Sequence, residues 1–240
     1  MKSDWFPMKV PEIDILVFPP FEGFPREAIS FLRRLKRNNN RRWFNNHKVE
    51  YILFVKQPMQ SYIYALKPYF SLFAPEYDVN PLRSIFRPNR DVRFSSDKTP
   101  YKTHIAAHFV LKDKPKGYSG AGYYVEIGLD GIYVGGGIYM PTSDQLRAIR
   151  NAIVNKHEEF SEIISETRFR KLLDVNEWNK LTRLPHGFDA KHPLAEWLKY
   201  KQFYVGVSWE VEKCYSKAFV LDSVKIFESI ANFVRFLNNI

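Results

Sequence analysis

The sequence predicts an α+β protein, in which an antiparallel sheet has N-terminal helices and C-terminal helices packed on it. Three observations predict this class. Before Pro81, apolar residues recur at helical spacing. From there to Tyr139, Gly, Tyr, Val and Ile become frequent and an alternating pattern replaces the helical one. At Ser143 the helical spacing returns, so the chain lacks the regular strand–helix alternation of a doubly wound sheet.

Length and composition are those of one globular domain. The chain has 240 residues, of which 45% are hydrophobic and 26% are charged. We expect residues 1–20 to form an extended arm and residues 21–240 to form a single α+β domain. Cys214 is the one cysteine, so no internal disulfide can form. The start has no signal-peptide pattern, and the sequence has no run of about 18 apolar residues, so we expect a cytoplasmic protein without a membrane span.

Three helices are expected in the N-terminal part. Pro25–Arg37 forms the first, because Pro25 suits a first turn and the short amides of Asn38–Asn40 favour its end. Arg41–Lys56 forms the second. The third opens at Pro58 and carries a steady apolar stripe, with a kink expected at Pro68.

The β-rich region carries one strong local signal, because Asp130-Gly131 between two β-rich runs is typical of a hairpin. Gly135–Gly137 lie inside an expected strand, where glycine marks a bulge or the close approach of a backbone or a ligand. The expected strands are Ile85–Arg87, Ile105–Leu111, Tyr123–Leu129, Ile132–Tyr139 and, later in the chain, Phe203–Trp209.

The sequence pattern of the C-terminal part predicts helices separated by a loop-rich stretch. Ser143 begins a long helical segment to about Ile164, with a possible break near His157. The other expected elements are a loop over Asp174–Pro193, a helical turn over Glu196–Lys201 and a closing helix over Ser223–Leu237.

Positive charge is concentrated in two segments. The net charge is +10; Arg26–Lys56 has nine basic and two acidic residues, and Arg83–His104 has six basic and two acidic residues. The first segment therefore carries +7, the second +4, and the remaining chain −1. A localised positive field favours anionic partners such as phosphates or nucleic acid. The alternative interpretation is a solvated basic face that aids solubility.

The segment Arg83–His104 is the candidate site, because it is too charged for a core strand and too rich in specific side chains for a plain loop. Its arginines offer planar forks of donors that match carboxylate or phosphate, and its two aspartates could hold those forks in position. The structural alternative is a buried ion-pair network that pins a long loop to the sheet. The candidate ligand-binding residues are Arg87, Arg90, Asp91, Arg93, Ser95, Asp97, Lys98, Tyr101, Lys102 and, on the helix after the hairpin, Arg150.

The sequence contains no metal or cofactor motif that we can identify. His104 and His108 are four residues apart on an expected strand, where their rings would lie roughly 13 Å apart, too far to share a metal ion. The glycines around Gly120 lack the Lys-Ser/Thr of a phosphate-binding loop.

The residues from Phe86 to Thr103 follow the pattern Phe-Arg-x-x-Arg-Asp-x-Arg-Phe-Ser-x-Asp-Lys-x-Pro-Tyr-Lys-Thr, and Asn39 to Phe44 follow Asn-Asn-x-x-Trp-Phe. Through these patterns the chain resembles the family of conserved hypothetical proteins called domain of unknown function 2461. The resemblance extends from about Phe24 to the C-terminus. Arg42 stands where the resemblance leads us to expect an acidic residue, which puts an ion pair there in doubt. The resemblance implies that the central motif forms one unit, and it implies no activity.

Three functions remain open. The first is binding of a phosphate-bearing or other anionic ligand in a basic cleft, with Asp91 or Asp97 as a general base if the ligand is a substrate. The second is a nucleic-acid-binding module that uses the basic N-terminal helices, with Trp43 and Phe44 available to stack on bases. The third is a non-catalytic scaffold. The residues do not decide whether the protein is an enzyme or which oligomeric state it adopts.

Overall fold

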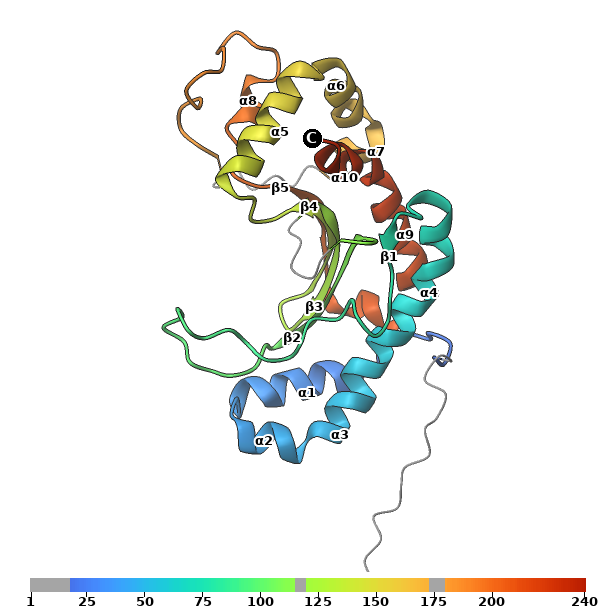
Figure 1. The fold of residues 1–240 in the computed structure, drawn as a ribbon. Coiled ribbons are helices and arrows are strands. Elements are labelled where there is room, and N and C mark those ends of the chain that lie inside the picture. The colour runs from blue at the N-terminus through green and yellow to red at the C-terminus, as the bar shows by residue number, and fades with distance from the viewer. Residues whose placement is uncertain (1–17, 115–119, 173–179) are drawn as a thin grey trace, which may run out of the picture.

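The computed structural model describes residues 18–114, 120–172 and 180–240, and its centre is an antiparallel sheet with the strand order β1-β2-β3-β4-β5 (Figure 1). Each strand pairs antiparallel with the next along the chain, so the α+β class is confirmed. The strands are β1 (Tyr77–Asp78), β2 (His104–Leu111), β3 (Gly122–Gly128), β4 (Ile132–Ile138) and β5 (Phe203–Trp209).

The hairpin predicted at Asp130-Gly131 joins β3 to β4. Gly131 has a φ of 130°, a conformation that glycine adopts without steric cost, and its carbonyl accepts a hydrogen bond of 2.9 Å from the Gly128 N–H. This turn sets the register in which Val125 lies opposite Val134. The strands themselves follow from alternation, because successive side chains point to opposite faces.

One face of the sheet is covered by three helices, α4 (Gln57–Phe73), α9 (Ala218–Ser229) and α10 (Ala231–Asn238) (Figure 1). Tyr123, on the covered face of β3, shows how the layers meet. Its ring meets those of Phe70 on α4 and Phe227 on α9 nearly edge-on, with centroid distances of 5.0 and 5.5 Å. Aromatic rings of this size bury the most apolar area per residue, so this layer holds much of the core.

The N-terminal helices differ from the prediction after the first one. The second predicted helix is divided at His47, and a π-helix over Tyr51–Lys56 then runs directly into α4. Pro58 therefore lies in the first turn of α4, where a missing N–H costs little, and Pro68 lies inside this helix. The shorter elements are α1 (Arg26–Arg37), α2 (Arg41–Asn46) and α3 (Lys48–Glu50).

The C-terminal helices also have different boundaries. A break at Lys156 separates α5 from α6, as expected near His157. The closing helix was predicted as one helix over Ser223–Leu237. In the structure it begins earlier, at Ala218, and Ile230 divides it into α9 and α10. The remaining elements are α5 (Ser143–Asn155), α6 (His157–Ser165), α7 (Thr167–Arg170), α8 (Ala195–Leu198) and a 3-10 helix over Val211–Tyr215.

Two further differences concern the edge of the sheet. The predicted strand Ile85–Arg87 is wrong, because this stretch forms only a single bridge, between Ile85 and Ala107. The two-residue strand β1 was not predicted, and such a short strand carries too few residues for an alternating pattern to be read.

Some expectations fall outside the described residues. These are the extended arm up to residue 17 and the part of the loop-rich stretch from Asp174 to residue 179. Among the described helices, none is both long enough and apolar enough to cross a bilayer.

Asn39, at the turn between α1 and α2, fixes the N-terminal helices to the central segment. Its side chain pairs with the backbone of Tyr101 through two hydrogen bonds: Nδ2 donates to the carbonyl at 2.8 Å and Oδ1 accepts from the N–H at 3.0 Å. The buried ring of Tyr101 stacks on Phe44 of α2 with a centroid distance of 4.0 Å and an interplanar angle of 15°. Asn39 thus pairs with the backbone as a neighbouring strand would.

We predict that Asn39→Asp lowers the free energy of unfolding. The carboxylate cannot donate to the Tyr101 carbonyl and places negative charge beside it, so the loss should be about 1–3 kcal/mol. Urea unfolding followed by circular dichroism measures the change. Asn46→Asp, at an exposed position on α2, is the matched control and should change stability by no more than about 0.5 kcal/mol. Equal effects of the two substitutions would contradict the role given to Asn39.

Candidate functional site

The central segment forms a flap, which we define as residues 84–103, that projects from the β2 edge of the sheet (Figure 1). A backbone hydrogen bond from Phe86 N to Ala106 O, at 3.0 Å, attaches the first arm to β2. Two others tie the arms to each other: Arg90 N to Pro100 O and Lys102 N to Pro88 O, both at 2.8 Å. Residues 90–99 form the tip.

The charged side chains of the tip bind one another. Arg93 donates two hydrogen bonds to the Asp91 carboxylate, from Nε at 3.0 Å and from Nη2 at 2.7 Å. Arg90 donates to both Asp97 and Thr99, and Lys98 donates to the Val92 carbonyl at 3.0 Å. The guanidinium groups of Arg90 and Arg93, which were expected to bind a ligand, are thus occupied within the tip.

These pairs keep both tip aspartates ionised. The Arg93 guanidinium and backbone N–H lower the pKa of Asp91 to about 2. The Thr99 backbone N–H, followed by Arg90, lowers the pKa of Asp97 to about 2. A carboxylate with so low a pKa is a poor proton acceptor near neutral pH, which argues against either aspartate as a general base.

The tip differs from the structural alternative that the sequence left open. It is no buried network that pins the flap to the sheet, because the Arg93 and Asp91 side chains are 76% and 48% exposed. Beside these pairs, Phe94 is 95% exposed and Ser95 is half-buried. The contacts that we find shape the tip itself.

The structure separates two of the predicted site residues from the rest. Tyr101 is buried against Phe44, so its ring is part of the core. Arg150 lies on α5 and donates to the carbonyls of Leu198 at 2.7 Å and Tyr200 at 3.1 Å. It caps the end of α8, at the opposite end of the sheet from the flap (Figure 1).

Two predicted residues lie where the flap meets the sheet. Lys102 is half-buried with Nζ 4.8 Å from the centre of the Phe86 ring. Burial and then the nearby charge of Arg87 lower the pKa of Lys102, while Glu126 opposes this shift. Among the described residues, neither Lys102 nor Arg87 forms a salt bridge with a carboxylate.

The sheet face opposite α4, α9 and α10 was not predicted from the sequence as a site. We call it the open face, because no described helix covers it (Figure 1). The strand register places polar and aromatic side chains on it in alternation with the buried ones: Glu126 lies opposite Tyr133, and Tyr133 lies opposite Ser208. The open face carries His104, Ala106, His108, Tyr124, Glu126, Tyr133, Tyr204 and Ser208.

A row of aromatic rings crosses the open face from the flap. Neighbouring ring centres are 6.2 Å apart for Phe86 and Tyr124, 6.3 Å for Tyr124 and Tyr133, and 6.1 Å for Tyr133 and Tyr204. His108 stacks parallel to Phe86 with an interplanar angle of 8°. Rings at such spacings contact one another, so the row is continuous across the sheet.

Two facing glycines make room for this row. Gly135 on β4 lies opposite Gly206 on β5. A Cβ added to Gly135 would lie 2.9 Å from the hydroxyl of Tyr133, and one added to Gly206 would lie 2.6 Å from it. The Tyr133 side chain therefore lies directly over the backbone of these two glycines. The close approach predicted at the β4 glycines is therefore made by a side chain of the protein itself.

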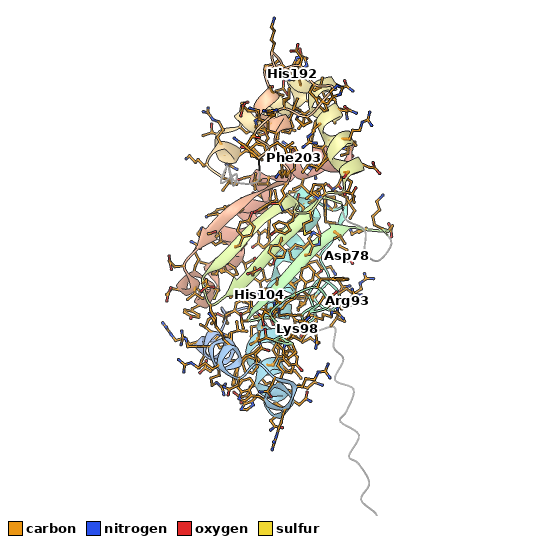
Figure 2. The ribbon with its side chains drawn as sticks, turned by 90° about the vertical axis from the view of Figure 1, so that its left-hand side faces the viewer. Asp78, Arg93, Lys98, His104, His192 and Phe203 are labelled. Atoms are coloured by element: carbon orange, nitrogen blue, oxygen red, sulfur yellow. The ribbon has the colours of Figure 1, made fainter. Side chains whose placement is uncertain are left out.

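The flap end of the open face contains a small cavity of about 190 Å³. Burial lowers the pKa of His104, which lines the cavity; Glu126 opposes this shift and Lys102 adds to it. In Figure 2, His104 lies at the same end of the molecule as Arg93 and Lys98, and Phe203 lies farther toward the other end. The cavity is lined by Thr103, His104, Glu126, Gly128, Leu129, Asp130, Gly131, Ile132, Tyr133 and Ser208.

A larger cavity of about 340 Å³ lies between α4 and residues 74–82. Its charged side chains are mostly paired: Asp78 with Arg83 at 2.9 Å, and Lys112 with the Pro75 carbonyl at 2.5 Å. Across the described ranges, we find no group of three or more His, Cys, Asp or Glu side chains that could hold a metal ion.

Comparison with known proteins gives a family and no closer relative. No curated protein and no solved structure matches this chain. The family model described as conserved hypothetical protein (DUF2461) matches residues 27–236 and so covers the flap, the open face and all the described helices except the first residue of α1 and the end of α10. This chain therefore belongs to the DUF2461 family of conserved hypothetical proteins.

Proposed function

We propose that this protein binds a small ligand with a planar ring and an anionic group on the open face of its sheet. The observation that carries the proposal is the aromatic row from Phe86 to Tyr204, which lies beside two cations that pair with no described carboxylate. Ligand sites combine apolar or aromatic walls with a few charged groups that set orientation, and this face offers both.

Lys102 is the main anion contact in this proposal. Its ammonium group already lies over the Phe86 ring, at the start of the aromatic row. Half-burial keeps water from screening its charge fully, and Arg87 is near enough to lower its pKa. A phosphate or carboxylate between these two cations would leave an attached ring free to lie against Phe86 and Tyr124.

The arginines of the tip have a different role in the revised proposal. Arg90 and Arg93 shape the tip by pairing with Asp97 and Asp91. In this proposal they do not bind the anionic group of the ligand, which was their expected role. Asp91, Asp97, Lys98 and Ser95 belong to the same unit. Of the predicted ligand-binding set, Arg87 and Lys102 are retained.

Adenosine monophosphate is a suitable probe, because it joins a planar base to a phosphate. We predict that it binds more tightly than adenosine or inorganic phosphate, and that Lys102→Ala weakens it about 10- to 100-fold, the usual effect of losing one hydrogen bond to a charged group. Phe86→Ala should lower the affinity for both adenosine and adenosine monophosphate. Isothermal titration calorimetry measures all of these affinities.

Lys98→Ala is the matched control, because it removes the same charge from the tip of the flap. It should leave the affinity for adenosine monophosphate within about twofold of wild type, well below the effect expected at Lys102. If Lys98→Ala and Lys102→Ala weaken binding equally, the tip contacts the ligand and the open face does not. If only Arg90→Ala has an effect, and this effect is on stability, the scaffold hypothesis is favoured.

Nucleic-acid binding by the N-terminal helices is a second candidate. Its charge is available, since Arg33, Lys36, Arg37, Arg41 and Arg42 are exposed on α1 and α2. Its stacking residues are less available: Trp43 stacks on His47 with a centroid distance of 4.0 Å, and Phe44 is buried against Tyr101. Phosphate contacts would therefore supply the affinity.

Salt dependence tests the second candidate. If the five exposed arginines and lysines contact phosphates, we predict a slope of log affinity against log salt of about −0.7 per contact for a single strand. Fluorescence anisotropy with a labelled oligonucleotide between about 50 and 200 mM salt measures the slope. Arg37→Gln with Arg41→Gln should make it shallower. A flat response excludes this mode of binding.

A further inference from the structure

The open face carries a connected set of three polar side chains on β2 and β3. The Tyr124 hydroxyl donates a hydrogen bond of 2.5 Å to Oε2 of Glu126. The other carboxylate oxygen, Oε1, lies 3.7 Å from Nδ1 of His104. Tyr124 therefore holds one side of the carboxylate and turns its other side toward the histidine.

The orientation of His104 distinguishes its two ring nitrogens. Nδ1 faces Glu126, so in a neutral ring Nδ1 is the nitrogen expected to carry the proton, because only an N–H benefits from a carboxylate at that position. Nε2 then has a lone pair and makes no hydrogen bond to the described residues. The His104 side chain is 32% exposed, so part of the ring is open to solvent.

The surroundings of His104 suit a proton acceptor. It lines the cavity of about 190 Å³ together with Thr103 and Ser208, whose hydroxyls can hold a water or a ligand oxygen. In general-base sites, a carboxylate hydrogen-bonded to one nitrogen orients a histidine whose other nitrogen faces the reacting group. Glu126 and His104 approach this arrangement at the longer distance of 3.7 Å.

We propose that His104 acts as a general base on the open face, with Glu126 and Tyr124 as positioning residues. In the step, the proton of a bound water or ligand hydroxyl moves to Nε2, and the oxygen keeps the electron pair. The imidazole becomes an imidazolium, whose charge the Glu126 carboxylate offsets. The proposal takes its location from the proposed ligand site and adds proton transfer to it.

Several titratable groups face His104. Burial lowers its pKa most, Glu126 on β3 opposes this shift, and Lys102 from the flap adds to it. Asp130, from the turn after β3, and Tyr133 on β4 line the same cavity. His108, on the same strand, is the matched comparison, because burial alone lowers its pKa and no carboxylate is paired with it.

Two-dimensional NMR of the histidine ring nitrogens tests the proposal in the unliganded protein. We expect His104 as the Nδ1–H tautomer near neutral pH. Glu126→Gln should lower the pKa of His104 by about one unit, because it removes a nearby opposite charge. Lys102→Met should raise it, and His108 should be unchanged in both variants. An Nε2–H tautomer in the wild-type protein overturns the proposal even if neither variant folds.

Reaction with diethylpyrocarbonate, followed by mass spectrometry, tests whether Nε2 is accessible. This reagent acylates neutral, exposed imidazole nitrogens, so His104 should be modified more rapidly than the more deeply buried His108. Failure of His104 to react while His186 reacts would also overturn the proposal. Neither measurement uses adenosine monophosphate, so a failure of ligand binding and a failure of the base are distinguished.

Discussion

Phe70 and Phe227 pack against the Tyr123 ring, and the arrangement of the whole molecule depends on this contact between the helices and one face of the sheet. The contact assigns alternate residues of each strand to the core. Tyr123, Val125 and Ile127 are therefore almost fully buried, whereas Tyr124 and Glu126 point the other way. A slip of one residue in register would exchange the two sets, so the core and the open face are specified together.

The flap is attached to this framework at its base. Asn39 and Phe44 hold Tyr101, so the helices before the sheet position the arm that carries Lys102 to the edge of the open face. The tip beyond this base is shaped by its own ion pairs. One segment thus has two parts with separate roles: a base packed into the core and a tip that contacts itself.

Local signals in the sequence predicted part of this structure well. The first helix, the Asp130-Gly131 turn and strand β5 are set by neighbouring residues and lie close to their predicted bounds. The division of the second helix at His47 and the break at Ile230 were not predicted, because the apolar periodicity continues across both positions. The motif from Arg87 to Lys102 was predicted to form one unit, whereas the structure divides it into a base and a tip. Sequence alone cannot tell whether an arginine turns to a ligand or to a nearby aspartate.

The open face could not be assigned from alternation alone. The sequence indicates that Tyr124 and Glu126 share a face, and that His104 and His108 do so on the preceding strand. It does not indicate which of the two faces the helices cover, nor that the two pairs lie side by side. That information comes from the pairing of β2 with β3 and from the position of α4 and α9.

The self-contained tip of the flap also affects how its residues can change over time. Its side-chain bonds lie between positions 90 and 99, and the chief pairs are Arg93 with Asp91 and Arg90 with Asp97. A substitution at one member of a pair leaves the other member without its partner within the tip, so related chains should keep or replace the two residues together. The motif that this chain shares with its family contains all four residues of these pairs.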